Sequence, residues 1–280
     1  MIPSQSVKPN QSPLSRAAAA MTCGWSDDPS GRRLIRKLLS RSVRFAITAR
    51  SRPLSTKGMN TVLAIAPHPD DEALGCGGTL AILKRENRAV HIGFVTDGAA
   101  SHPAHPIHRP EAIAAIRRRE ALAAAHLLGI APSELHFLNA PDGSLQRLPL
   151  AAREDLIARI SALLTLIKPD AVLLPSRNDG SSEHNAAFIL VDQAIKKTAL
   201  TCRVLEYPVW AWRNPLLLAG NSTGYRNVWK LDLGDLRFIK AAAIDAYASQ
   251  TRPIPPDLDA VLPEDFTSEF KLPDELIFER

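Results

Sequence analysis

The sequence predicts an α/β protein with a mainly parallel sheet and helices on both faces. Its 280 residues are 45% hydrophobic and 22% charged, close to the average of globular proteins, which excludes a wholly disordered or fibrous chain. From residue 60 onward, short apolar runs alternate with helical patterns of about 15 residues, as in successive βαβ units. Ligands of such sheets bind where the strands end, so polar residues at those points are the candidates for function.

Five apolar runs are predicted strands, and turn residues follow several of them. The first run ends at Pro67 and the second at Asp97-Gly98, while the third precedes the turn Pro141-Asp142-Gly143. The runs are Thr61–Ala66, Val90–Thr96, Leu135–Leu138, Ala171–Leu174 and Arg203–Tyr207.

Four helical patterns separate these runs. The second is rich in alanine and is closed by Gly129, and the third stops before Pro169, since proline cannot continue a helix. The patterns span Glu72–Glu86, Glu111–Leu128, Ala152–Ile167 and His184–Thr198. Further along, we expect a strand at Asn227–Leu233, a helix at Leu236–Ala248 and a loop at Pro253–Pro263.

The N-terminal 59 residues are predicted to form a flexible, basic extension. Residues 1–60 contain eleven Lys and Arg against two Asp, so they carry +9 and the remainder of the chain carries −4. The basic charge therefore does not belong to the main domain, which argues against nucleic-acid binding there. Residues 31–50 have the pattern of a basic amphipathic helix, which suits an anionic membrane, a partner protein, packing on its own domain, or a mobile arm.

Cysteine usage and hydropathy indicate a cytoplasmic protein. The three cysteines, Cys23, Cys76 and Cys202, lack the spacing of a metal site. Since an odd number cannot all pair in disulfides, a reducing compartment is the simpler interpretation. No apolar run approaches the roughly 18 residues of a membrane-spanning helix.

The end of the first predicted strand has the highest density of ionisable side chains. Its sequence is Pro67-His68-Pro69-Asp70-Asp71-Glu72, with one imidazole and three carboxyl groups. Acidic residues favour the first turn of a helix, and capping alone explains one or two of these carboxylates. It does not explain a histidine fixed between two prolines. A His and an Asp three residues apart can ligate one divalent metal, and the Asp between them can face a water molecule on it.

The run from Ala66 to Thr79 resembles the signature of the LmbE-like, or PIG-L, zinc-dependent N-deacetylases. The resemblance extends over most of residues 60–250 and implies a Rossmann-like fold with one metal site. Supporting matches are Val95-Thr96-Asp97-Gly98, Arg117 with Glu120, Pro141-Asp142-Gly143, and a late helix from Lys240 to Gln250. The Gly75-Cys76-Gly77-Gly78 run lies inside the predicted helix, where small residues favour close packing on the sheet.

The second metal motif of the family is only partly present. It is usually H-x-D-H, opened by an Asp two residues earlier; here Asp179 and His184 align, Ser181 replaces the first histidine and Glu183 replaces the Asp. The resemblance implies His68, Asp71 and His184 as ligands of Zn²⁺ (or Fe²⁺) and Asp70 as general base. Because Ser181 replaces a histidine associated with the acid half of the reaction, the general acid is unassigned.

Several strand-end residues are candidates for substrate binding. They are Arg109, Asp97, Arg177, Asp179 and Trp210. Exposed arginines are often merely solvated, and Trp210 can equally pack in the core. His102, His105 and His108 lie in a Pro-rich loop that we interpret as a lid rather than a second metal site, although one of them could supply a general acid.

The resemblance implies that residues 60–280 form a metal-dependent deacetylase domain. Its expected partner is a small N-acetylated amino sugar or glycoconjugate; we expect no nucleic-acid partner, and the oligomeric state is open. The alternatives are an amidase acting on a sugar-linked conjugate and a non-catalytic sugar- or nucleotide-binding domain. Nucleic-acid binding through residues 31–52 is a further alternative, which salt-sensitive affinity would reveal.

Overall fold

The computed structural model describes residues 30–214 and 225–279, and within residues 30–37 the backbone only. Most of the segment predicted to be a flexible extension, residues 1–29, lies outside this description. No helix in the described part combines the length and the apolar character that crossing a bilayer requires.

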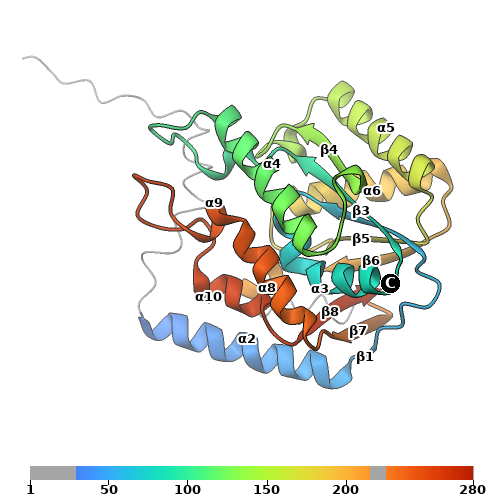
Figure 1. Cartoon of the computed structure of the whole chain (residues 1–280), viewed down its shortest axis with the longest axis horizontal. Coiled ribbons are helices and arrows are strands. Elements are labelled where there is room, and N and C mark those ends of the chain that lie inside the picture. The colour runs from blue at the N-terminus through green and yellow to red at the C-terminus, as the bar shows by residue number, and fades with distance from the viewer. Residues whose placement is uncertain (1–29, 215–224, 280) are drawn as a thin grey trace, which may run out of the picture.

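The described residues form an eight-stranded sheet with the order β1-β7-β8-β6-β5-β2-β3-β4 (Figure 1). The strands are β1 (Arg52–Pro53), β2 (Thr61–Ala66), β3 (Ala89–Thr96), β4 (Leu135–Ala140), β5 (Ala171–Pro175), β6 (Arg203–Tyr207), β7 (Asn227–Asp232) and β8 (Asp274–Glu279). Strands β2 to β6 pair in parallel, as does β1 with β7, whereas β8 is antiparallel to both of its neighbours. The predicted α/β fold with a mainly parallel sheet is confirmed.

Helices cover both faces of this sheet. The α-helices are α2 (Ser30–Arg50), α3 (Asp71–Arg85), α4 (Pro110–Leu127), α5 (Leu150–Ile167), α6 (Ser182–Thr198), α8 (Leu236–Ala246), α9 (Ala248–Thr251) and α10 (Glu264–Thr267). Short 3-10 helices lie at Ala99–Ser101, Pro132–Glu134, Leu145–Arg147, Trp210–Arg213 and Ser268–Phe270. Helices α3, α4 and α8 pack together on one face, and α5 packs with α6 on the other (Figure 1).

Strand β2 lies at the centre of the core. Val62 and Ala64 join the apolar cluster under α3, while Leu63 and Ile65 join the cluster under α5 and α6, and all four side chains are fully buried. A strand buried on both faces has no polar face, which explains the continuous apolar run in the sequence. The chain adds β3 on one side of β2 and β5 on the other, so the end of β2 is a topological switch point.

The C-terminal strand β8 was not predicted. Its sequence Asp274-Glu275-Leu276-Ile277-Phe278-Glu279 combines three buried apolar residues with acidic flanks. Acidic residues are poor strand formers, but here they have partners: Glu275 accepts hydrogen bonds from the backbone N–H groups of Gly78 and Thr79, and Glu279 pairs with Arg203. Tertiary contacts therefore override the local propensity.

Helix α2 packs on the body of the protein at the sheet edge formed by β1 and β7 (Figure 1). Ile47 is buried, Ser40 donates to the carbonyl of Trp212, and Arg44 donates to the carbonyl and the carboxylate of Asp274. Residues 31–50, which were predicted to form an amphipathic helix, thus lie in helix α2. The domain boundary at residue 60 remains a prediction.

Close packing of α3 on the sheet depends on Gly75. A Cβ built on this residue would lie 2.0 Å from the ring of Tyr207 on β6, far inside van der Waals contact. The ring has little freedom to move, because Tyr207 is fully buried and its hydroxyl donates a 2.6 Å hydrogen bond to the carbonyl of Ile65. The expected role of the small residues in α3 is confirmed at this position.

We predict that Gly75→Ala destabilises the fold by about 1–3 kcal/mol, the usual cost of overpacking a core. Gly77→Ala is the matched control, because it lies in the same helix and its added Cβ would come no closer than 3.4 Å to a neighbouring side chain. Removing a helical glycine there should leave stability unchanged or raise it by up to about 1 kcal/mol. Urea unfolding of both variants measures the difference, and equal midpoints would contradict this account of α3 packing.

Candidate metal centre

The three predicted metal ligands come together at the carboxyl end of β2. The backbone N–H of His68 donates to Asp71 Oδ2 at 2.9 Å, and the Nδ1 atom of His68 lies 3.1 Å from the same oxygen. His184, at the start of α6, places its Nε2 atom 3.2 Å from Asp71 Oδ1. One donor atom from each residue lies within 4.8 Å of the other two, although their role as ligands remains a prediction.

The environment of His184 fits a bound cation. The side chain is fully buried, yet neither ring nitrogen makes a hydrogen bond of acceptable geometry with the described residues. Both nitrogens still lie beside carboxylates, with Nδ1 2.8 Å from Asp179 Oδ2. Buried imidazole nitrogens normally have partners, and a carboxylate behind the ring is common where the other nitrogen ligates a metal. Two imidazoles and one carboxylate suit Zn²⁺ or Fe²⁺.

The electrostatics of the cluster favour positive charge. Burial alone would raise the pKa of Asp71, but the neighbouring His184 and His68 hold that pKa well below its usual range. Burial opposes protonation of His184, yet Asp71 and Asp179 raise its pKa to about 9. In the absence of a metal these carboxylates therefore attract protons to the imidazoles, and a divalent cation would compete for the same positions.

Asp70 does not cap helix α3. It occupies the position before the helix, but its side chain makes no capping hydrogen bond, and its backbone adopts φ 132°, which residues other than glycine rarely do. Instead its Oδ2 atom lies 3.1 Å from Nη2 of Arg117. Burial raises the pKa of Asp70 to about 7, against the opposing effect of Arg117. A carboxylate with this pKa can take up a proton near neutral pH, as a general base must.

Three residues that were not predicted as site residues hold Asp70 in place. Arg117 is buried and also donates to the carbonyl of Pro69. Glu72 accepts the backbone N–H of Asp70 at 3.1 Å and the hydroxyl of Tyr247, and burial raises its pKa to about 8. Arg117 and Tyr247 do lie in the motifs that resemble the family, which was the available signal.

Asp142 and Glu183 are further residues that sequence reasoning left unassigned. Asp142 Oδ1 lies 3.1 Å from the Nε2 atom of His68, and its other oxygen accepts the backbone N–H of Ala100. Glu183 lies two residues after Ser181, whose hydroxyl accepts the backbone N–H of His184 and so caps α6. The position of Asp142 in the turn after the third predicted strand was a signal for its place in the site.

Two of the predicted substrate-binding residues are held by other parts of the protein. Asp179 is fully buried and accepts hydrogen bonds from the backbone N–H groups of Val209, Trp210 and Ala211, so its burial leaves no surface for a substrate. Arg177 donates from its backbone and its guanidinium group to Glu206. For Asp179 the geometry corrects the expectation: the carboxylate positions His184 and the loop after β6.

The remaining three candidates lie at different places around the strand ends. Trp210 stacks on Phe266 with ring centroids 5.0 Å apart, which is a packing contact. Arg109 is exposed just before α4. Asp97 follows β3 and accepts the backbone N–H of Ala99 at 3.0 Å. Their roles in substrate binding remain predictions.

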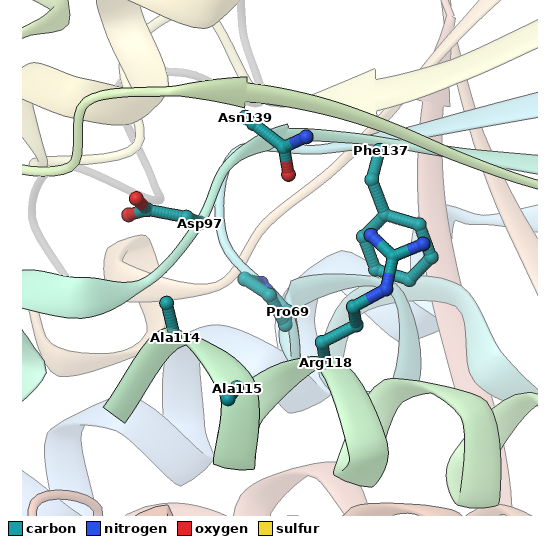
Figure 2. Close-up of a pocket in the computed structure, with 7 residues that line it drawn as sticks. All are labelled: Pro69, Asp97, Ala114, Ala115, Arg118, Phe137 and Asn139. Atoms are coloured by element: carbon teal, nitrogen blue, oxygen red, sulfur yellow. The ribbon is translucent and has the colours of Figure 1, made fainter. Parts of the chain in front are cut away.

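A small cavity lies beside Pro69, between α4 and the ends of β3 and β4 (Figure 2). Its volume is about 140 Å³. The lining residues are Pro69, Asp97, Ala114, Ala115, Arg118, Phe137 and Asn139. Figure 2 shows the Arg118 guanidinium over the ring of Phe137, at a distance of 3.8 Å from the ring centroid. Asp97 thus helps to line a space beside Pro69, which lies between His68 and Asp70 in the sequence.

The histidines of the predicted lid are close to one another without forming a metal site. Ring centroids of His105 and His108 lie 4.9 Å apart, and those of His102 and His105 lie 6.1 Å apart. His105 Nδ1 accepts the backbone N–H groups of Ile107 and His108. Within the described ranges, the groups of three ligating side chains with donor atoms close enough for one ion do not include these histidines.

Comparisons with solved structures show the same fold. N,N'-diacetylchitobiose deacetylase from Pyrococcus horikoshii is 22% identical, with a TM-score of 0.55 over 82% of this chain and 83% of that chain. A deacetylase of the teicoplanin biosynthetic pathway is 18% identical, with a TM-score of 0.58 over 78% and 97%. GalB, a 4-carboxy-2-hydroxymuconate hydratase from Pseudomonas putida KT2440, is 22% identical, with a TM-score of 0.55 over 69% and 80%.

A family model identifies the domain itself. The model described as PIG-L, GlcNAc-PI de-N-acetylase, matches residues 63–195. This range begins in β2 and ends in α6, so it includes His68, Asp70, Asp71 and His184. Residues 63–195, the part of the α/β domain that carries the candidate metal centre, therefore match the PIG-L (LmbE-like) family model.

Proposed function

We propose that the protein is a zinc-dependent N-deacetylase that hydrolyses the acetamide group of an N-acetylated amino sugar or its conjugate. The observation that carries this proposal is the group of His68 with the buried Asp71 and His184, next to Asp70 in the chain and inside the range that the PIG-L model matches. One of the structural neighbours is an N,N'-diacetylchitobiose deacetylase, which supports this substrate class.

The proposed metal ligands are His68, Asp71 and His184. Bound there, Zn²⁺ would polarise the amide carbonyl and lower the pKa of a water molecule. Fe²⁺ suits the same donor atoms, so we propose zinc as the principal ion and iron as the alternative. The carboxylate of Asp179 would keep the His184 ring in a fixed orientation.

Asp70 is the proposed general base. As water attacks the acyl carbon, its proton passes to the Asp70 carboxylate, which Arg117 holds in position. The C–N bond then breaks, acetate forms, and Asp70 returns the proton to the leaving nitrogen. This return matters here because Ser181, in place of the family's first motif histidine, has its hydroxyl engaged at the start of α6.

The substrate would enter at the carboxyl ends of the strands. Asp97 lines the cavity beside Pro69, and the exposed Arg109 lies at the start of α4, so both can reach a polar sugar conjugate. Arg177 and Trp210 are proposed as secondary substrate contacts. Arg177 already donates a hydrogen bond to Glu206, and Trp210 already stacks on Phe266. The catalytic domain is proposed to span residues 60–280, with residues 1–59 as an extension.

The function is tested with a panel of N-acetylhexosamine conjugates. We expect acetate and primary amine to appear in equal amounts, and we expect a chelator to abolish both and added Zn²⁺ to restore them. An amine released with a different acyl product would identify the amidase alternative. Saturable binding without any product would support the non-catalytic alternative and contradict the proposed function.

Asp70→Asn separates catalysis from metal binding. The substitution keeps the shape of the side chain and removes its basic oxygen, so turnover should fall by about 10²–10⁴-fold while metal content is unchanged. His184→Ala is the comparison variant, because it removes a proposed ligand and should lose both metal and turnover. Elemental analysis and acetate release are measured on the same preparations.

Two results would refute these assignments. Normal turnover of Asp70→Asn with a normal metal content would remove Asp70 from the mechanism. Full metal content in folded His184→Ala would remove His184 from the ligand set. Circular dichroism of both variants checks that the fold is retained.

We also propose that helix α2 contacts an anionic membrane and that the protein works in the cytoplasm. Leu38, Leu39 and Phe45 are 55%, 42% and 77% exposed, and Arg41 and Arg50 are exposed on the same helix. Exposed apolar side chains next to arginines are typical of helices that lie in the lipid interface. Cys76 and Cys202 are free thiols, which suits a reducing compartment.

Phe45→Ser tests the membrane contact. Binding to phosphatidylcholine vesicles that contain phosphatidylserine should weaken by about tenfold or more, since burying a phenylalanine is worth roughly 1.5–3 kcal/mol. The matched control is Phe238→Ser on α8, where the side chain is 62% exposed. Equal binding of both variants and the wild type, measured by co-sedimentation, would exclude this role for α2.

A further inference from the structure

His68 is shared by two groups of potential metal ligands. Besides the group with Asp71 and His184, a second group consists of His68, Asp142 and Glu183, and one donor atom from each lies within 4.8 Å of the other two. The two ring nitrogens face different carboxylates: Nδ1 lies 3.1 Å from Asp71 and Nε2 lies 3.1 Å from Asp142. The ring is therefore placed between two sets of acidic oxygens.

Glu183 has an unsatisfied carboxylate oxygen. The residue is 3% exposed, and its Oε1 atom accepts the backbone N–H of Leu145 at 3.1 Å. Its Oε2 atom is buried and makes no hydrogen bond of acceptable geometry with the described residues, although the backbone N–H of Gly143 lies close enough to lower the pKa that burial raises. A buried carboxylate oxygen without a partner is costly, so natural proteins normally supply a donor or a cation at such a point.

The buried charges exceed what one divalent cation balances. Arg117 pairs with Asp70. Four further carboxylates surround the two imidazoles, all nearly or fully buried, and they belong to Asp71, Asp142, Asp179 and Glu183. With neutral imidazoles these four groups carry a formal charge of −4, and a cation at the first site leaves −2. The uncompensated negative charge then lies on the side of Asp142 and Glu183.

We propose that His68 Nε2, Asp142 and Glu183 form a second divalent-cation site next to the first. One imidazole nitrogen and two carboxylates are a donor set that Zn²⁺ accepts. When both sites are filled, the His68 ring bridges the two ions as an imidazolate, and its remaining ring proton is released to solvent. This binding does not depend on which reaction the protein catalyses.

The proposal is tested by counting bound Zn²⁺. The full chain is stripped with a chelator and dialysed against buffered free Zn²⁺, and the metal per chain is measured by elemental analysis. The background variant is His91→Ala, because His91 and His136 form a half-buried pair with ring nitrogens 3.3 Å apart that could bind zinc on their own. In this background we expect two Zn²⁺ per chain.

Three substitutions then identify the second site. Glu183→Gln and Asp142→Asn keep the side-chain shape and remove one charge each, so each should lower the count from two to one. Asp97→Asn is the matched control, because Asp97 follows the neighbouring strand but belongs to neither ligand group, and it should keep two. Titration with Co²⁺, followed by its visible absorption, should show two stages in the background protein and one stage in Glu183→Gln.

The outcomes decide the proposal in either direction. A single Zn²⁺ in the background protein would overturn it, as would two Zn²⁺ in folded Glu183→Gln and Asp142→Asn. Two Zn²⁺ in the background protein and one in both variants would establish it. Circular dichroism checks that each variant is folded. If one of Glu183→Gln and Asp142→Asn fails to fold, the Zn²⁺ content of the other variant decides.

Discussion

The turn between β2 and α3 is the constraint on which the candidate site depends. Asp70 is held at φ 132°, a conformation that costs of order 1–3 kcal/mol for a residue with a side chain. Arg117 bonds to the carbonyl before it and lies against its carboxylate, and Glu72 accepts its N–H. These contacts hold the strained residue, so that the Asp70 carboxylate lies beside Arg117 while the Asp71 carboxylate lies beside His184.

The same turn explains why α3 begins with buried acids. A helix start tolerates carboxylates, but Asp71 and Glu72 are only 2% and 0% exposed. Charged groups favour a helix N-terminus without being buried, so helix capping does not account for this burial. Each has a partner brought by another element: His184 from α6 for Asp71 and Tyr247 from the end of α8 for Glu72. The parallel sheet makes this possible, because its strand ends bring loops from distant parts of the chain to one edge.

The fold alone does not determine the reaction. Among the solved structures with this fold are two deacetylases and a hydratase, all with TM-scores of 0.55 to 0.58. Function in such folds lies in the residues at the strand ends. In this chain those residues include Ser181, whose hydroxyl accepts the backbone N–H of His184 at the start of α6, and the buried Glu183.

The sequence by itself determined the six strands β2 to β7 and the place of the candidate centre. The continuous apolar run of β2 and the turn from Pro67 to Glu72 are local patterns, which can be recognised without knowledge of the tertiary structure. Only the tertiary structure decided which side chains meet. It placed Asp142 on the far nitrogen of His68 and fully buried Asp179 behind His184, and it supplied partners that made the acidic segment at residue 274 into β8. The contact of Asp142 with His68 and the pairing of β7 with β8 join segments more than forty residues apart, and Asp179 is held by a loop that begins thirty residues further along the chain. Neither periodicity nor spacing encodes contacts between such distant segments.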